Sequence, residues 1–195
     1  MIDMKKQQVI LIRHGKTKGN EEGRYLGKTD LPLSPLGRQE VENSEYPVAE
    51  IVFTSPRLRC IETAKIIYPE SKPIVIDGLR EMDFGDFEYK NYEELKDDPR
   101  YRAWIDNEDG TMQCPNGESR EDFAKRCVAE FKLIMAEDYL QEAETVALVV
   151  HGGTIMSLMD KLTEHSGKYY DFMVQNGHGY ICDFDGEKLQ ITAEI

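Results

Sequence analysis

Two short runs of continuously apolar residues constrain most strongly what this chain can fold into. Residues 9–12 are β-branched at three of four positions, and residues 146–150 are apolar throughout. Such runs are typical of strands that are buried on both faces. Residues 51–53 and 74–76 are two shorter candidates. Because helical patterns separate these runs, we expect an α/β fold whose central sheet is covered on both faces.

Four helices are predicted from capping residues and apolar periodicity. Ser55 followed by Pro56 indicates an N-cap and a first helical position. The buried stripe that we expect on that helix consists of Leu58, Ile61, Ala64 and Ile67. Ser34, Ser119 and Thr154 are the expected N-caps of three further helices.

Residues 81–109 differ from the rest of the chain, because they hold eleven acidic and four basic side chains with little periodicity. We interpret this region as part of an acidic insertion, at about residues 83–118, that lies over the pocket within a single domain of residues 1–195. The aromatic residues Tyr92, Tyr101 and Trp104 within it are expected to pack rather than to bind ligand. Residues 179–195 are expected to form a hairpin around residues 185–186.

The balance of charge excludes several classes of function. The 195 residues include 24 basic and 37 acidic side chains, which gives a formal net charge of −13. A chain this acidic repels nucleic-acid backbones and anionic lipid, so neither is an expected partner. Its longest apolar runs are about five residues, far below the roughly 20 that span a bilayer. The polar residues 1–8 do not resemble a secretory signal.

Four cysteines are scattered along the chain, at Cys60, Cys114, Cys127 and Cys182, and they form no CxxC pair. This spacing predicts neither a disulfide framework nor a zinc site. We therefore expect free thiols and a cytoplasmic location.

A short sequence pattern occurs twice, in two distant parts of the chain. His14 and His151 each follow a predicted strand, and each is followed by glycine and then by Thr17 or Thr154. In an open α/β sheet, the carboxyl ends of the strands form the ligand crevice. We therefore expect the two histidines to meet at that edge of the sheet. His165 and His178 have no such context and are expected to be surface residues or local structure.

Cations beside these histidines indicate an anionic ligand. Arg13 adjoins His14, and Arg57 lies at the start of a predicted helix, where a cation opposes the helix dipole. Guanidinium groups and free amides at helix starts suit phosphate oxygens. The sequence therefore predicts a phosphate pocket.

The chemistry of such a pocket suggests roles for its residues. A neutral imidazole is a nucleophile at phosphorus, and nearby arginines disfavour its protonation. The leaving oxygen then needs an acid, and Glu81 is placed just past the strand expected at residues 74–76. Asp83 and Glu88 stay open as alternatives to Glu81.

Several blocks of the chain resemble the signatures of the histidine phosphatase superfamily, also called the phosphoglycerate mutase-like family. Residues 13–20 are similar to its RHGxTxxN signature, and residues 25–37 to its YxGxTDxPLSxxG continuation. Later blocks, in the same order as in the family, are residues 54–64, 79–88 and 149–153. The resemblance implies a three-layer α/β/α sandwich with a mostly parallel central sheet.

The resemblance also implies the roles of individual residues. His14 would be the phosphorylated nucleophile, Glu81 the proton donor, and His151 a catalytic ligand of the phosphoryl oxygens. The implied substrate-binding residues are Arg13, Asn20, Leu26, Gly27, Arg57 and Gly152. Neither a metal nor an organic cofactor is implied.

The activity that the resemblance implies is metal-independent hydrolysis of a small phosphorylated metabolite through a phosphohistidine. The short chain and residues 25–37 look most like α-ribazole phosphatases and small broad-specificity phosphatases of this family. The alternatives are a phosphoglycerate mutase and a non-catalytic phosphate-binding module. Whether the chain forms a homodimer stays open.

Three departures from the family pattern concern the rim of the pocket, and therefore the substrate. Lys16, Gly19 and Tyr89 stand where many members have Glu, Trp and Gly, respectively. Lys16, Lys18 and Lys28 either add a positive field at the mouth or are ordinary surface lysines.

Overall fold

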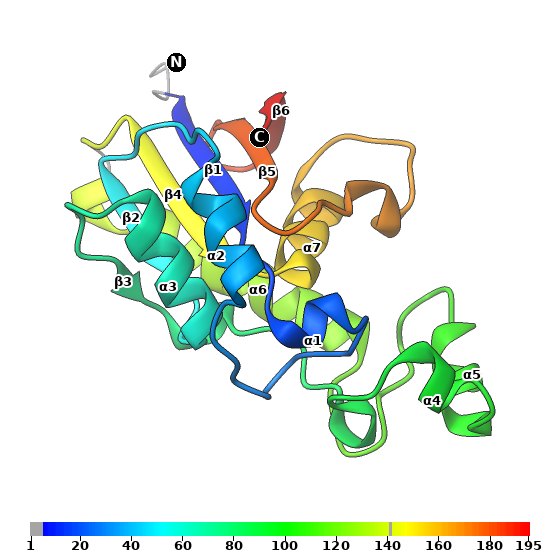
Figure 1. The fold of residues 1–195 in the computed structure, drawn as a ribbon. Helices are drawn as coiled ribbons and strands as arrows, with labels where there is room; N and C mark the ends of the chain where they lie inside the picture. Colours follow the sequence, from blue (N-terminus) through cyan, green and yellow to red (C-terminus); the bar gives the residue numbers. More distant parts are fainter. Residues whose placement is uncertain (1–5, 141) are drawn as a thin grey trace.

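The computed structural model describes residues 6–140 and 142–195, and its central feature is a sheet with the order β3–β2–β4–β1–β5–β6 (Figure 1). The strands are β1 Gln7–Arg13, β2 Ile51–Thr54, β3 Ile74–Val75, β4 Thr145–Val150, β5 Gly179–Phe184 and β6 Leu189–Glu194. The first four strands pair in parallel, and β5 and β6 pair antiparallel. Most of the polar opening segment, residues 1–8, lies outside the described residues.

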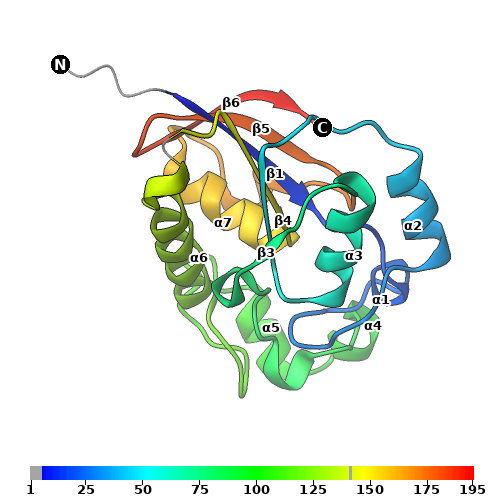
Figure 2. The same cartoon turned by 90° about the vertical axis from the view of Figure 1, so that its left-hand side faces the viewer.

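Helices cover both faces of the sheet, as Figure 2 shows. The helices are α1 Lys18–Glu21, α2 Pro35–Glu42, α3 Leu58–Ile67, α4 Tyr92–Leu95, α5 Pro99–Ile105, α6 Arg120–Met135 and α7 Gly152–Leu162. Helices α6 and α7 pack on one face, and α2 and α3 lie over the other. The predicted three-layer α/β/α sandwich with a mostly parallel sheet is confirmed.

Side-chain alternation along the central strands supplies both layers with a core. In β1, Val9 and Leu11 face the α6–α7 layer, whereas Ile10 and Ile12 face the α3 layer. All four are fully buried. This explains why the strand is apolar without interruption. The edge strand β3 differs, since its two residues are exposed.

The predicted helix starts are right at two positions and wrong at two. Ser34 and Ser119 accept the expected backbone N–H bonds as N-caps of α2 and α6. Helix α3 begins at Leu58 rather than at Pro56, and Ser55 is not its cap, because the Ser55 hydroxyl bonds a histidine instead.

Helix α7 also begins earlier than predicted. It starts at Gly152 with His151 as the N-cap residue, and Thr154 is a buried residue within its first turn. The glycine that follows the histidine therefore opens the helix itself, rather than a turn before it.

The buried stripe predicted for α3 is right at Ala64, only half-buried at Ile61 and Ile67, and wrong at Leu58. Its buried residues are Arg59, Cys60, Thr63 and Ala64, whereas Leu58 is 39% exposed. The polar members of this face are buried because they turn toward the carboxyl ends of the parallel strands. An apolar periodicity rule therefore selected the neighbouring stripe.

Residues 81–118 form short helical turns and loops at the carboxyl ends of the strands, with α4 and α5 below the sheet in Figures 1 and 2. The 3-10 turns of the chain are η1 Asp77–Leu79, η2 Gly85–Phe87, η3 Asp138–Leu140 and η4 Tyr169–Phe172. Tyr101 packs among aromatic rings and is 1% exposed, as predicted, and Trp104 joins the same cluster. Tyr92 also packs against Tyr101, with ring centroids 6.3 Å apart, although it is 53% exposed. The boundaries of the acidic insertion stay a prediction.

Tyr89, one of the departures from the family pattern, has a left-handed backbone with φ of 57°. Glycine adopts this conformation without the steric cost that a β-carbon brings. Here Arg24 holds the tyrosine, because its guanidinium lies 4.9 Å from the ring centroid and its Nη1 donates to the Tyr89 carbonyl at 2.6 Å.

Two further expectations are confirmed. β5 and β6 form the predicted antiparallel hairpin, and Gly186 in its turn has φ of 98°. The four cysteines are free and buried. Among the residues that the structure describes, no helix is long and apolar enough to cross a membrane.

Candidate active site

The two histidines from distant parts of the sequence meet at the carboxyl ends of β1 and β4. These strands are parallel neighbours, and Arg13 pairs in register with Val150, so the residues that follow each strand lie side by side. The ring centroids of His14 and His151 are 5.3 Å apart, and the exposed fractions are 4% and 0%. The expected convergence of the two imidazoles is therefore confirmed.

The hydrogen bond of His14 defines which of its nitrogens is available. Its Nδ1 donates to the carbonyl of Gly15 at 2.7 Å, because a carbonyl only accepts. Burial, followed by the charges of Arg59 and Arg13, holds the pKa of His14 well below its ordinary value. The neutral ring therefore presents an Nε2 that carries a lone pair.

His151 is held by the hydroxyl that was predicted to cap a helix. Its Nε2 and the Oγ of Ser55 are 2.7 Å apart, and the thiol of Cys60 lies 3.6 Å from the same nitrogen. Burial and then the charge of Arg59 hold the pKa of His151 well below its ordinary value. Both imidazoles are therefore neutral near pH 7.

Three arginines near this pair share an unusual feature. The buried Nε atoms of Arg13, Arg57 and Arg59 have no hydrogen-bond partner among the described residues. A buried donor without an acceptor costs about 1–3 kcal/mol. Because oxygens of a phosphoryl group would satisfy such donors, the cost is offset when an anion binds.

Arg59 was not assigned a role from the sequence. It is fully buried in the first turn of α3, and it lowers the pKa of both histidines. A signal was available, since Arg59 and Thr63 are four residues apart on one helical face. The amide of Gly15, next to His14, donates to the Thr63 hydroxyl at 2.9 Å.

The loop at residues 26–29 binds the two terminal nitrogens, Nη1 and Nη2, of the Arg59 guanidinium. Its Nη1 donates to the carbonyl of Thr29 at 2.9 Å, and its Nη2 to those of Leu26 at 3.0 Å and Gly27 at 3.2 Å. The predicted binding residues Leu26 and Gly27 thus contact a guanidinium through their backbone.

Glu88 fixes this loop from the opposite side. Its Oε1 accepts from the amides of Gly27 and Lys28, both at 2.9 Å, and its Oε2 from the Thr29 hydroxyl at 2.7 Å. A β-carbon on Gly27 would collide with the Met82 carbonyl and the Glu88 carboxylate, so glycine is required there. The Glu88 carboxylate is therefore occupied by loop contacts.

Asn20 and Gly152 lie close to the histidine loops. The Oδ1 of Asn20 accepts from the amide of Thr17 at 3.0 Å, which closes the capping box of α1. A β-carbon on Gly152 would lie 3.2 Å from the Nε of Arg13. Glycine therefore lets the start of α7 approach that guanidinium closely.

Of the three carboxyl groups left open as proton donors, Glu81 is the one placed at the start of α7. Its Oε2 accepts from the amide of Gly153 at 3.3 Å, and its Oε1 from that of Met82 at 3.0 Å. Burial raises the pKa of Glu81 above its ordinary value, against the opposing effect of Arg59. Asp83 instead pairs with Lys28 at 3.3 Å.

The rim lysines each pair with a carboxylate. Lys16 lies 2.8 Å from Glu40, and Lys18 lies 3.4 Å from Glu21. With Lys28 paired to Asp83, these contacts favour ordinary surface lysines over a positive field at the mouth.

The remaining histidines make local contacts. The ring of His165 bonds the Asp160 carbonyl at 3.1 Å, and that of His178 bonds the Ile195 carbonyl at 2.8 Å. Among the described residues, no group of three His, Cys, Asp or Glu side chains could hold a metal ion.

Comparison with known proteins agrees with this geometry. The family model of the histidine phosphatase superfamily (branch 1) matches residues 9–194. The uncharacterized phosphatase PhoE of Bacillus subtilis is 34% identical over 165 residues, which cover 82% of this chain and 77% of that protein. The adenosylcobalamin/alpha-ribazole phosphatase of Escherichia coli is 30% identical over 160 residues, which cover 78% and 77%. The solved alpha-ribazole phosphatase of Shigella flexneri has a TM-score of 0.80 and 24% identity, with 96% and 95% covered.

Proposed function

The chain belongs to the histidine phosphatase superfamily, branch 1, and on that premise we propose that it hydrolyses phosphomonoesters through a phosphohistidine at His14. Members of this family are phosphatases and mutases that act on small phosphorylated substrates. One observation carries the proposal. Two neutral imidazoles 5.3 Å apart lie near three arginines whose buried Nε–H groups have no acceptor among the described residues. This arrangement suits the binding of a tetrahedral oxyanion.

In the first proposed step, the Nε2 of His14 attacks phosphorus. The P–N bond forms as the ester P–O bond breaks, and Glu81 gives its proton to the departing alkoxide. Arg13, Arg57 and His151 bind the phosphoryl oxygens, and Asn20 assists. Arg59 adds its charge from below the loop at residues 26–29.

In the second proposed step, water releases the phosphoryl group. The Glu81 carboxylate takes a proton from a water molecule whose oxygen attacks phosphorus. The P–O bond forms, the P–N bond breaks, and the electron pair returns to Nε2 of His14. The raised pKa of Glu81 suits this alternation between acid and base.

For the physiological substrate, we propose α-ribazole phosphate or a related small metabolite. The supporting observation is the similarity to the adenosylcobalamin/alpha-ribazole phosphatase of Escherichia coli, at 30% identity. The free thiols support a cytoplasmic location, and the net charge of −13 supports the absence of nucleic-acid and membrane partners.

Incubation with p-nitrophenyl phosphate, α-ribazole phosphate and 3-phosphoglycerate tests the reaction type. We expect inorganic phosphate to be released, most efficiently from α-ribazole phosphate, and His14→Ala to abolish the release. Rapid isomerisation of 3-phosphoglycerate with negligible phosphate release would instead assign a mutase. Tight phosphate binding without turnover would assign a non-catalytic binding module.

A further inference from the structure

A cavity of about 450 Å³ opens beside Glu81 and Gly153, next to the phosphate site. Eleven of its sixteen lining residues are aromatic residues, methionines or isoleucine. The aromatic ones are Tyr25, Phe84, Trp104, Phe123, Tyr169 and Tyr170. Glu81 lines this cavity and also accepts from the amide of Gly153, two residues after His151, so the cavity adjoins the candidate active site on the side of the proposed proton donor.

The cavity contains little charge that could meet a second anionic group. Besides Glu81, the one charged side chain among its described lining residues is Arg120. Its Nη2 donates to the carbonyls of Asn107, at 3.1 Å, and Glu108, and its Nη1 donates to the Tyr170 hydroxyl at 3.2 Å. The guanidinium also lies 5.3 Å from the ring centroid of Tyr169.

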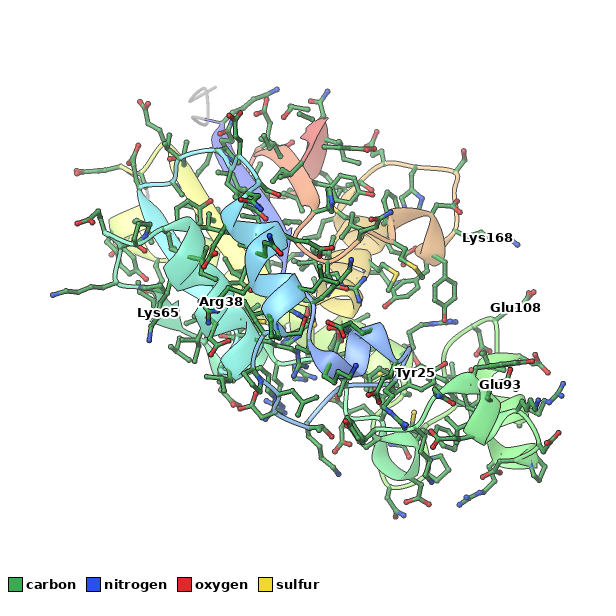
Figure 3. All side chains as sticks on the ribbon, viewed as in Figure 1. Tyr25, Arg38, Lys65, Glu93, Glu108 and Lys168 are labelled. Atoms are coloured by element: carbon green, nitrogen blue, oxygen red, sulfur yellow. The ribbon has the colours of Figure 1, made fainter. Side chains whose placement is uncertain are left out.

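Arg120 thereby joins the two walls of the cavity. Figure 3 shows Glu108, in the loop after α5, and Lys168, just before η4, on neighbouring segments at the right of the molecule. Since several of its N–H groups already donate to these walls, the guanidinium offers a flat surface over aromatic rings rather than a free anion site.

We propose that this cavity binds the alcohol portion of the substrate, and that this portion is a planar, uncharged ring system. The inference rests on the proposed function, because it takes the neighbouring pocket to be the phosphoryl site. Aromatic walls favour a flat ring through offset or edge-to-face contacts, and methionines such as Met112 and Met173 adapt to its outline.

The same walls discriminate against short acidic alcohols. The carboxylate of a phosphoglycerate would leave water for a surface of aromatic and thioether groups, beside the Glu81 carboxyl. The cation in the wall, Arg120, already donates to Asn107 and Tyr170, so a carboxylate would have to displace these bonds to pair with it, and an anion without such a partner is disfavoured.

Matched esters test the inference without interference from leaving-group acidity. 2-Phenylethyl phosphate and 2-(naphthyl)ethyl phosphate are compared with propyl phosphate, since all release simple primary alkoxides. We expect kcat/KM to be at least about tenfold higher for the ring esters. Calorimetry with the corresponding phosphonates, which have no scissile ester bond, measures the same preference as binding.

Exposed lining residues provide variants that should fold normally. Met112 and Met173 are 41% and 58% exposed, and either residue replaced by Asp places a carboxylate at the cavity wall. We expect Met173→Asp and Met112→Asp each to lower the ratio of kcat/KM for the ring esters to kcat/KM for propyl phosphate at least about fivefold. Leu133→Asp on α6, 65% exposed and outside the cavity, is the control.

The outcomes separate the two proposals. Equal kcat/KM for ring and propyl esters, or a preference for 3-phosphoglycerate, overturns the ring inference and leaves the hydrolase intact. No hydrolysis of any ester, together with tighter binding of ring phosphonates, overturns the hydrolase and supports the cavity assignment. Equal binding of ring and propyl phosphonates overturns the cavity assignment in either case.

Discussion

The same physical cause shifts the nucleophile and the acid in opposite directions. Burial disfavours charge, so it lowers the pKa of His14 and raises that of Glu81. Burial thereby favours the neutral form of each group, with a lone pair on the imidazole and a proton on the carboxyl. Without this opposition, a free imidazole and a free carboxyl would hold the wrong protonation states for the first step at mildly acidic pH.

These shifts predict a pH profile. Activity needs neutral His14, whose low pKa keeps it active into acid, and protonated Glu81, whose proton is lost as pH rises through its raised pKa. We expect kcat/KM for alkyl esters to fall on the alkaline side, and Glu81→Gln to lower it and remove that limb. An unchanged alkaline limb in Glu81→Gln would contradict the assignment of Glu81 as proton donor. Glu88→Gln is measured alongside it, because Glu88 is one of the alternative donors.

Arg57 provides a test of transition-state binding. Its Nε–H lacks an acceptor among the described residues, and its charge lowers the pKa of His151. We expect Arg57→Ala to lower kcat by about 10²–10³, as loss of one preorganised donor does elsewhere. The exposed Arg100, which pairs with Asp98, provides the control variant Arg100→Ala. A change below about threefold in Arg57→Ala would contradict the role.

At the scale of elements, Glu88 and the loop at residues 26–29 act as a clamp on Arg59. The loop amides donate to Glu88, and the loop carbonyls accept from Arg59. The charge of Arg59 in turn helps to lower the pKa of both histidines. A carboxylate outside the reaction thus helps to orient a cation inside it.

Glu88→Ala should therefore weaken both stability and catalysis. We expect about 2 kcal/mol less free energy of unfolding, because several amide donors lose their acceptor. We also expect kcat/KM to fall about tenfold through misplacement of Arg59. Chemical denaturation and steady-state kinetics measure the two effects, with the exposed Glu93→Ala as control. A Glu88→Ala variant that is destabilised but fully active would contradict the claim that Glu88 orients Arg59 for catalysis.

The elements also show where the sequence is informative. Continuous apolar runs located β1 and β4, and the repeated histidine after each strand indicated their convergence. The starts of α3 and α7 were misplaced because Ser55 bonds a histidine instead of capping, and because α7 already begins at Gly152, two residues before Thr154. Arg59 was missed because the rule applied to α3 looks for apolar residues, whereas this side chain is buried through its bonds to the loop at residues 26–29.

At the scale of the whole molecule, an acidic chain concentrates cations at one edge of its sheet. The net charge is −13, yet three arginines meet two histidines where β1, β2 and β4 end. The parallel register brings these ends together, so the topology rather than the overall charge creates the anion site. Because the two histidines at this edge are buried, the stability of the fold also depends on pH.

Folding should become less favourable as the solution is acidified. The histidines titrate near 6.5 when unfolded, and well below that when folded, so the unfolded chain binds protons that the native one excludes. Below 6.5 each therefore lowers the free energy of unfolding by up to about 1.4 kcal/mol per pH unit. Glu81 opposes this, because its raised pKa gives stability that is present below 4.5 and is lost as pH rises through the folded value.

Denaturation at about pH 7.5 and about pH 5.5 measures this linkage. We expect His14→Gln to weaken the loss of stability on acidification, because it removes one of the buried imidazoles. Identical pH dependence in His14→Gln and the native chain would contradict a buried neutral imidazole.

Trapping of the covalent intermediate tests the central claim most directly. The protein is mixed with a phosphomonoester labelled on phosphorus, quenched in alkaline denaturant and digested, since phosphohistidine is stable to base and labile to acid. We predict label on the peptide that contains His14, more of it in Glu81→Gln because water attack is slowed, and none in His14→Ala. Label on another residue, or full turnover by His14→Ala, would contradict the account.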